Sequence, residues 1–449
     1  MLREPLALDQ TAPPGFLALA KGVAWVLGPS ERALRLIPLL GSLFALVLLP
    51  RLSRRFQPPW ITVFAAGLFA VFPTLIWYGS DFKPYATDVL ASIALMLCAF
   101  GLRDPDSRGV RFVGAAALGA AAVWFSQPAV FVLAGLGAAL VVLALTDRPQ
   151  TLSARLVVML AVWAAAAAAS VAAAMHRVPP EMDAYLKRFW NPMFPKWPLL
   201  AFIALGAAVL WIRDRRAAVI VLGPVAVTLA AAGARLYPFS GRAVAFLAPA
   251  GILAMAEVAG WIVEGLARLR VPRRVGALVP AAALVLVLVL DPPVYRDEDA
   301  RPVLAGVAQQ WQPGDAMYVL YAGARAVRYY GPLVGLRGNG ILLGDCHRDD
   351  PRAYWRDLDR YRGRPRVWVF RTHLIGALAE EEILDGYLAR LGSRTEHIQE
   401  EGADASLWDL SRAAAPADAA ETLPLPPGSA STASRVGCGH GPIGVAPWD

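Results

Sequence analysis

Long apolar runs separated by short charged segments fill the first 290 residues of this chain. Runs of about 15–24 apolar residues recur there, and an α-helix needs roughly 20 to cross the hydrocarbon core of a bilayer. A shorter amphipathic segment, 16–27, carries Lys21 and is expected to lie on the membrane surface as a helix. The ten predicted spans are 35–50, 60–79, 88–102, 111–125, 128–145, 156–175, 197–212, 217–234, 243–266 and 275–290.

Composition and charge agree with a membrane protein and change how the basic residues are interpreted. Of the 449 residues, 57% are hydrophobic and only 17% are charged, whereas about a quarter of an average soluble protein is charged. A net charge of +8 would raise the question of nucleic-acid binding in a soluble protein. Here the basic residues lie mostly in loops between apolar runs, so they indicate membrane topology and no nucleic-acid partner.

The loop charges predict which ends of the spans face the cytoplasm. Alternate loops between the ten spans hold fifteen Lys and Arg residues in one set and seven in the other. Because positively charged loops stay on the cytoplasmic side, we expect the richer set there. Arg32 and Arg35, before the first span, count against this orientation. Both ends of a ten-span chain would then lie outside, and the loops at 81–88 and 235–242 would face outward.

Composition changes at Asp291, and residues 291–412 are patterned like a small α/β domain outside the membrane. Alternating strands and helices favour a short, mainly parallel sheet, and Asp350 and Pro351 are typical N-cap and first residues of a helix. Residues 413–449 are rich in Ala, Pro, Ser and Gly without periodicity, which predicts disorder. The expected strands are 316–321, 366–371 and 406–410, and the expected helices are 299–310, 322–330, 350–361 and 374–391.

The outward loop between the second and third spans carries the densest group of reactive side chains. The segment 77–88 contains Asp81, Lys83, Tyr85 and Asp88. A carboxylate beside a cation and a phenol can act as a general base, hold a metal or orient a phosphate. The same residues would also serve as interfacial anchors, because Trp and Tyr favour the headgroup level and charged residues flank membrane spans.

Further candidates lie in other parts of the chain. Arg242 directly precedes the ninth span, where a guanidinium could bind a lipid-linked phosphate bidentately or simply reach lipid headgroups. Asp9, in a short segment before the surface helix, is a weaker candidate. Glu257 lies inside the ninth span and is expected either to pair with an arginine or to lie near the cytoplasmic end.

Histidines and cysteines form no recognisable metal-site or disulfide pattern in the sequence. All five histidines lie outside the predicted spans, and the ligand-rich segment 345–350 has no second cluster to complete a metal site. Cys346 and Cys438 could meet in an oxidising compartment, but a disulfide is not expected. The sequence contains no Walker loop, no GxSxG motif and no HExxH motif.

The order of these features resembles bacterial members of the GT-C membrane glycosyltransferases, which include protein O-mannosyltransferases and aminoarabinose transferases. The resemblance covers most of residues 8–265, and an outer domain after the spans fits it too. Each motif is weak alone, whereas their order together with the topology is moderately specific. The stretches that carry the resemblance are 8–16 (LDQTAPPGF), 28–36 (GPSERALRL), 78–85 (YGSDFKPY), 126–131 (SQPAVF) and 237–242 (YPFSGR).

This resemblance implies transfer of a sugar from a polyprenyl-phosphate donor to a lipid, glycan or protein acceptor on the outer face of a bacterial inner membrane. No cofactor or metal ligand is assigned, and a divalent metal stays open because only some branches of the family depend on one. Gln127 stands where relatives often have His. The site residues implied are Asp81 and Asp9 as catalytic candidates, and Lys83, Tyr85, Asp88 and Arg242 as donor- and phosphate-binding candidates.

The sequence departs from the family pattern at its beginning. Relatives have a first transmembrane helix and then an outer loop whose acidic residue is the expected catalytic base. Only Glu4 and Asp9 lie upstream of the surface helix here, so the chain is expected to lack that helix and the usual base. One further upstream helix would also return the N-terminus to the cytoplasm.

Two alternatives to an active glycosyltransferase stay open from the sequence. An inactive or non-enzymatic relative, acting as a scaffold or lipid-binding protein, would fit the shortened start. A transporter is less favoured, because the sequence shows no inverted repeat and no charged residues shared across mid-span positions. Binding of a polyprenyl phosphate without sugar transfer would distinguish the first alternative from an enzyme.

Overall fold

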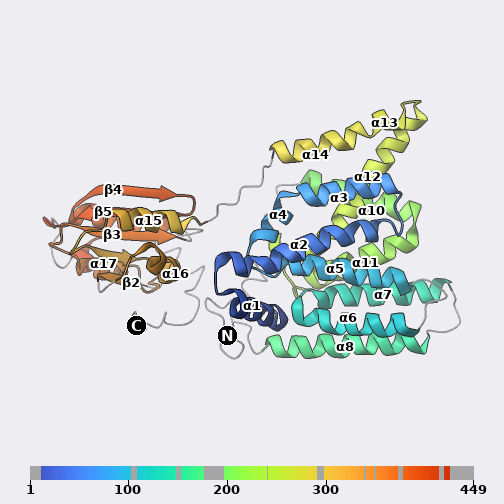
Figure 1. The fold of residues 1–449 in the computed structure, drawn as a ribbon, viewed down its shortest axis with the longest axis horizontal. Coiled ribbons are helices and arrows are strands. Elements are labelled where there is room, and N and C mark those ends of the chain that lie inside the picture. The colour runs from blue at the N-terminus through green and yellow to red at the C-terminus, as the bar shows by residue number, and fades with distance from the viewer. Residues whose placement is uncertain are drawn as a thin grey trace. The chain divides into compact units, whose positions relative to one another are not determined.

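A computed structural model describes the chain in two units, a helical unit that ends at Val294 and an α/β unit that begins at Tyr295 (Figure 1). Each unit has its own cluster of buried apolar side chains. The described residues are 12–102, 109–147, 153–175, 197–239, 241–290, 298–337, 340–347, 350–372, 378–413 and 419–424.

The helical unit is built from α-helices and one 3-10 helix. Its elements are α1 (Pro14–Leu27), α2 (Glu31–Ser53), α3 (Pro59–Val71), α4 (Pro73–Ser80), α5 (Tyr85–Leu102), α6 (Gly109–Phe125), α7 (Ala129–Asp147), α8 (Ala154–Met175), α10 (Trp197–Arg213), α11 (Arg215–Gly233), η3 (Gly241–Leu247), α12 (Ala248–Arg268), α13 (Arg273–Gly276) and α14 (Leu278–Leu290).

The prediction of a polytopic helical membrane protein is confirmed, whereas the count of ten spans is not. Each predicted span coincides with a helix or a pair of consecutive helices. Among the described residues, seven segments are long and apolar enough to cross a bilayer, or eight if α3 and α4 form one bent span. Helices α6 and α10 are also apolar, but their apolar segments are shorter than 18 residues.

The predicted span 60–79 consists of two helices, since the segment is broken at Pro73. Helices α3 and α4 meet there at an angle of 57°. Proline has no N–H to donate to the preceding turn, and its ring clashes with the carbonyl four residues earlier. Phe72 accordingly leaves the helical conformation, with ψ at 113°. The break aims α4 differently from α3 and so sets the position of the loop that follows.

Capping side chains fix two helix starts that the apolar pattern alone misplaces. Helix α2 begins before the predicted position 35, because the Ser30 hydroxyl accepts a hydrogen bond from the Ala33 N–H at 3.2 Å. Asp214 caps α11 in the same way, accepting from the Ala217 N–H at 3.0 Å. Each cap provides an acceptor for one N–H group that has no partner in the first helical turn.

A helix forms where the surface helix was predicted, and α1 is amphipathic. Its Phe16 and Ala20 are buried and form a small cluster with Ile37 of α2. On the other face, Trp25 is 87% exposed. An exposed tryptophan on a helix beside membrane spans is typical of interfacial helices, although the location of α1 on a bilayer surface stays a prediction.

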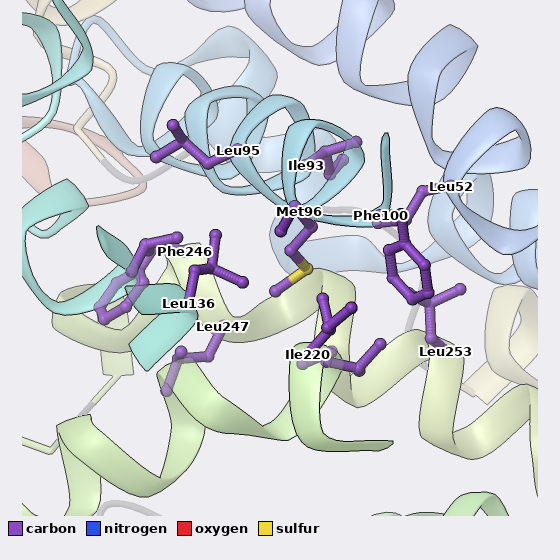
Figure 2. Close-up of a cluster of buried hydrophobic side chains, with 14 of the residues drawn as sticks. Leu52, Ile93, Leu95, Met96, Phe100, Leu136, Ile220, Phe246, Leu247 and Leu253 are labelled. Atoms are coloured by element: carbon purple, nitrogen blue, oxygen red, sulfur yellow. The ribbon is translucent and has the colours of Figure 1, made fainter. Parts of the chain in front are cut away.

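Helices α5 and α12 form the centre of the helical unit. In the span that contains α12, 78% of the residues are buried inside the protein, against 11% in the span formed by α13 and α14. Figure 2 shows apolar side chains of α2, α5, α7, α11, η3 and α12 packed together around Met96 and Phe100 of α5. The residues around the reactive loop are therefore attached to the best-packed helix pair.

Small residues let the backbones of neighbouring helices approach closely. Gly135 of α7 lies against Pro224 of α11, where an added Cβ would come within 2.4 Å of the proline nitrogen. Gly206 of α10 lies against Ala254 of α12, where a Cβ would come within 2.0 Å of the carbonyl oxygen. In a bilayer, helices associate through this kind of close van der Waals packing, because burial against lipid tails drives little association.

Glu257 of α12 pairs with an arginine, which is one of the two roles that the sequence analysis expected for it. Its Oε2 accepts from Arg213 Nη1 at 2.7 Å, and its Oε1 accepts from Gln57 Nε2 at 2.8 Å. Gln57 in turn accepts from the Ser53 hydroxyl at 2.7 Å. Ser53 and Gln57 join α2 to α3, so this network connects that turn to α10 and α12, away from the α4–α5 loop.

The α/β unit contains a five-stranded sheet with helices on both faces. Its elements are α15 (Ala300–Gln310), β1 (Ala316–Val319), η4 (Tyr321–Gly323), α16 (Ala324–Val334), β2 (Ile341–Leu343), α17 (Arg352–Asp359), β3 (Val367–Thr372), α18 (Leu378–Leu391), β4 (Ser393–Glu400), β5 (Ala403–Asp409) and α19 (Ala419–Thr422).

The three predicted strands and four predicted helices are all present, but the sheet is mixed and two strands were missed. The strand order is β2-β1-β3-β5-β4, with β1 parallel to β2 and β3, and with β5 antiparallel to β3 and β4. A two-residue turn at Glu401–Gly402 joins β4 to β5, and such a short connection requires antiparallel strands. Strand β2 has three residues and β4 is an exposed edge, so neither shows an apolar alternation.

Three further expectations about the α/β unit need correction. Helix α17 begins one residue later than predicted, with Pro351 rather than Asp350 at the N-cap. Within the segment predicted to be disordered, α19 forms, and Ala420 is buried; residues 414–418 and 425–449 lie outside the described residues. Cys346 is disulfide-bonded. Cys98 is free, and Cys438 lies outside the described residues.

Replacing Arg213 by methionine should destabilise the helical unit by about 1–2 kcal/mol, because it leaves the buried Glu257 carboxylate without its guanidinium partner. We expect a lower Tm when the detergent-solubilised protein is unfolded by heat and followed by tryptophan fluorescence. Arg215→Met removes an exposed arginine two positions later and should leave Tm nearly unchanged. Equal Tm values for the wild type and Arg213→Met would contradict a stabilising ion pair.

Candidate functional site

The α4–α5 loop holds three of the predicted site residues in one tight turn. Helix α4 ends at Ser80, and the Asp81 N–H donates to the Trp77 carbonyl at 2.9 Å. The Lys83 N–H then donates to the Asp81 carbonyl at 2.7 Å, which reverses the chain before α5 begins at Tyr85. Asp81, Lys83 and Tyr85 are each partly buried. The carboxylate, the ammonium group and the phenol are therefore presented from one short segment.

Tyr78 brings this loop together with Arg242, which is far away in the sequence. The Tyr78 side chain is buried, and its ring centroid lies 4.8 Å from that of Tyr85. Its hydroxyl interacts electrostatically with Tyr85, Arg242 and Asp81. Two groups that the sequence analysis proposed separately therefore lie within electrostatic range of one phenol. The sequence analysis did not single out Tyr78, although it lies within the motif 78–85.

Arg242 is positioned by η3, which packs against α5. The span predicted at 243–266 does not begin as an α-helix: residues Gly241–Leu247 form a 3-10 helix before α12. The Tyr237 hydroxyl donates to the Ala243 carbonyl at 2.7 Å. The Tyr237 ring lies 4.4 Å from that of Phe131. These contacts hold the turn of η3, while Arg242 itself stays exposed at the surface.

Asp88 lies apart from the other predicted residues of this loop. It is in the first turn of α5 and only 6% exposed, whereas Asp81 is partly accessible. Ser126, at the end of α6, is the polar side chain that interacts with it. A role for Asp88 in phosphate binding stays a prediction, and a buried carboxylate would repel a phosphate rather than attract it.

The remaining predicted residues do not add to this group within the described structure. Asp9 lies outside the described residues. Gln127 lies in the turn between α6 and α7 and is partly buried. In the part of the chain that the structure describes, no three His, Cys, Asp or Glu side chains are close enough to hold a metal ion. The question of a divalent metal therefore gains no support from side-chain clustering.

The arrangement of these side chains suits a phosphate and a hydroxyl group held close together. Lys83 and Arg242 provide positive charge, and an arginine can bind two phosphate oxygens at once. Asp81 provides a carboxylate that can accept a proton. Tyr78 and Tyr85 provide two phenol rings in contact, tilted by 52° to each other. Cations, base and aromatic rings thus gather where α4, α5 and η3 meet.

The fold and these side chains together define a class of protein. It is a polytopic helical membrane protein with several polar side chains at the ends of its central helices, followed by an α/β unit. No protein-family model and no curated protein matches the chain.

Solved structures of two membrane proteins are similar to this chain. One is ArnT from Cupriavidus metallidurans bound to undecaprenyl phosphate, with 14% identity, a TM-score of 0.49, and coverage of 88% of this chain and 87% of that chain. The other is the archaeal oligosaccharyltransferase AglB from Archaeoglobus fulgidus in complex with an inhibitory peptide and a dolichol-phosphate, with 12% identity, a TM-score of 0.49, and coverage of 88% and 66%.

Both proteins are GT-C glycosyltransferases, the class that the sequence motifs resemble. At these identities and TM-scores below 0.5, the roles of their residues do not transfer to positions in this chain. The roles of Asp81, Lys83 and Arg242 therefore rest on the geometry around Tyr78.

Replacing Tyr237 by phenylalanine should loosen η3, because the Ala243 carbonyl loses its hydroxyl donor. The loss of one hydrogen bond is about 1 kcal/mol, so amide exchange over 241–247 should become about fivefold faster. Hydrogen exchange followed by mass spectrometry measures this, with peptides from α2 as an internal reference. Tyr329→Phe, at an exposed tyrosine of the α/β unit, is the matched control. Unchanged exchange over 241–247 in Tyr237→Phe would show that this bond does not hold η3.

Proposed function

We propose that this protein transfers a sugar from a polyprenyl-phosphate donor to an acceptor hydroxyl at the outer face of a bacterial inner membrane. The observation that supports the proposal is that Asp81 and Arg242 both lie within electrostatic range of Tyr78, with Lys83 in the same loop and η3 packed on α5. A base and two cations next to a membrane surface are what transfer from a lipid phosphate requires, because the leaving group is negatively charged.

The chemistry follows from the charges of these groups. Asp81 accepts the proton of the acceptor hydroxyl, whose oxygen attacks the anomeric carbon of the donor sugar. The bond from that carbon to the phosphate oxygen breaks, and the lipid phosphate leaves with the electron pair. Lys83 and Arg242 stabilise the charge that develops on the phosphate. A single displacement of this kind inverts the configuration at the anomeric carbon.

The choice of a lipid-linked donor has two supports. The proposed site lies at the ends of helices that are apolar enough to span a membrane, so a donor with a polyprenyl chain can reach it from within the bilayer. In addition, the similar structures contain undecaprenyl phosphate in ArnT and a dolichol-phosphate in AglB. The acceptor is a hydroxyl compound of the same membrane face, a lipid, a glycan or a protein.

The outward orientation of the site rests on charge and on redox chemistry. The loop set that contains Lys83 and Arg242 has seven basic residues, against fifteen in the opposite set, and the poorer set faces outward. The α/β unit follows the last span and contains the disulfide-bonded Cys346. Disulfides persist in oxidising compartments and are rare in the cytoplasm. We therefore propose that both the site and the α/β unit lie outside the cytoplasm.

Purified protein in lipid nanodiscs should transfer radiolabelled sugar from polyprenyl-phosphate donors, and two variants should separate binding from chemistry. Arg242→Gln should weaken binding of undecaprenyl phosphate at least about tenfold, because a charged hydrogen bond is lost. Asp81→Asn should abolish transfer and leave lipid-phosphate binding within about threefold, because it removes the base and no phosphate ligand.

Arg235→Gln is the matched control, since Arg235 is an exposed arginine of the same outer segment. Equal effects of Arg235→Gln and Arg242→Gln on binding would overturn the phosphate role of Arg242. Binding without transfer in the wild type would indicate a non-enzymatic lipid-binding protein. Absence of both binding and transfer would reject the proposed function.

Single cysteines should report the orientation of the helical unit. Arg235→Cys should react with a membrane-impermeant maleimide in intact spheroplasts, because we place it outside. Arg54→Cys, at the α2–α3 turn, should react only after permeabilisation, since that turn belongs to the basic loop set. Both are exposed arginines replaced by cysteine, so they differ only in the side of the membrane. The reverse labelling pattern would invert the proposed topology.

A further inference from the structure

Three buried polar atoms without hydrogen-bond partners lie in the first turns of α5 and just after α6. They are Oδ1 of Asp88 and the hydroxyl oxygens of Ser92 and Ser126. Asp88 is 6% exposed, Ser92 is fully buried and Ser126 is 1% exposed. A buried polar atom without a partner costs free energy, and three such atoms within the described residues of one helix junction call for a physical explanation.

The positions of these residues let their side chains point to a common place. Asp88 and Ser92 are four residues apart on α5, and side chains with this spacing lie one above the other on the same helix face. Ser126 follows α6, which packs against α5. Asp88 and Ser126 interact with each other, although neither Asp88 Oδ1 nor the Ser126 hydroxyl has a full hydrogen bond. The site thus joins α5 to the end of α6.

Charge makes this place different from an ordinary pair of buried serines. A carboxylate inside a membrane protein must be neutralised, because moving an isolated charge out of water costs many kcal/mol. Glu257 meets this requirement with Arg213. For Asp88, Ser126 is the one polar side chain found to interact with it, and no cationic side chain of the described residues pairs with it. Among the described residues, therefore, no side chain supplies the positive charge.

The possible ligands can be compared by what they satisfy. A proton on Asp88 neutralises the charge and lets the carboxyl donate one hydrogen bond and accept others, but it does not bind all three oxygen groups at once. A water molecule supplies hydrogen bonds but no charge. A divalent cation would leave an excess positive charge beside a single carboxylate. A monovalent cation balances the carboxylate, and it accepts oxygen ligands from all three side chains at once.

We propose that Asp88, Ser92 and Ser126 form a buried binding site for one monovalent metal cation. The carboxylate and the two hydroxyl oxygens are hard ligands of the type that such cations prefer. The bound cation connects α5 to the end of α6, one helical turn inward from Tyr85. This site does not depend on sugar transfer, and its test needs no donor or acceptor.

Thermal unfolding of the purified full-length chain in sodium-free nanodiscs tests this site. At constant ionic strength and pH, replacing choline chloride by sodium chloride should raise Tm by about 5 °C, with saturation as the site fills. Potassium and lithium chloride are measured in parallel. Asp88→Asn should remove the cation dependence. Glu264→Gln, which neutralises a carboxylate near the C-terminal end of α12, should retain the full dependence.

Two further variants keep the proposal falsifiable if Asp88→Asn does not fold. Ser92→Ala and Ser126→Ala should each raise the half-saturating cation concentration at least about threefold, because each removes one ligand. Identical Tm in sodium, potassium, lithium and choline would overturn the proposal. A stabilisation that follows pH and ignores the cation would also overturn it, by assigning a proton to Asp88. A cation effect retained in both serine variants and in Asp88→Asn would place the ion elsewhere.

Discussion

The hydrocarbon interior of a bilayer offers no water, so polar groups there must find partners within the protein. The ionisable side chains of the helical unit meet this constraint in two ways, with one exception. Glu257 is buried with Arg213 and Gln57 in a hydrogen-bonded network. The reactive side chains of the α4–α5 loop lie at helix ends, where partial exposure is tolerated. Asp88 belongs to neither group, and its isolation leads to the proposed cation.

The same constraint explains why the candidate site lies where regular helices stop. The α3–α4 break at Pro73 interrupts one span one short helix ahead of the Asp81 loop (Figure 1), and the 3-10 helix η3, which carries Arg242, interrupts another. Irregular backbone in a membrane protein survives only where its groups find other partners, as the Ala243 carbonyl does with Tyr237. The apolar packing shown in Figure 2 around α5 then holds these irregular segments in place.

Much of the fold could be predicted from the sequence, and each failure has a physical cause. Apolar length located the spans, because lipid requires it regardless of neighbours. The break at Pro73 had a local signal that the apolar run concealed. The N-cap Ser30 also had a local signal, but the span boundary was set by hydrophobicity instead. The edge strand β4 carried no such signal, because an exposed strand needs no apolar alternation.

For the candidate site, the sequence by itself determined which reactive groups share the short loop with Asp81, since covalent proximity requires no tertiary fold. The ten predicted spans would also put that loop and Arg242 on the same side of the membrane, because consecutive spans alternate direction, and this stays a prediction. Only the tertiary structure decided that Arg242 approaches Tyr78, that Glu257 pairs with Arg213, and that Asp88 turns inward. These outcomes depend on which helix faces pack together, and no local pattern specifies the partner of a distant side chain.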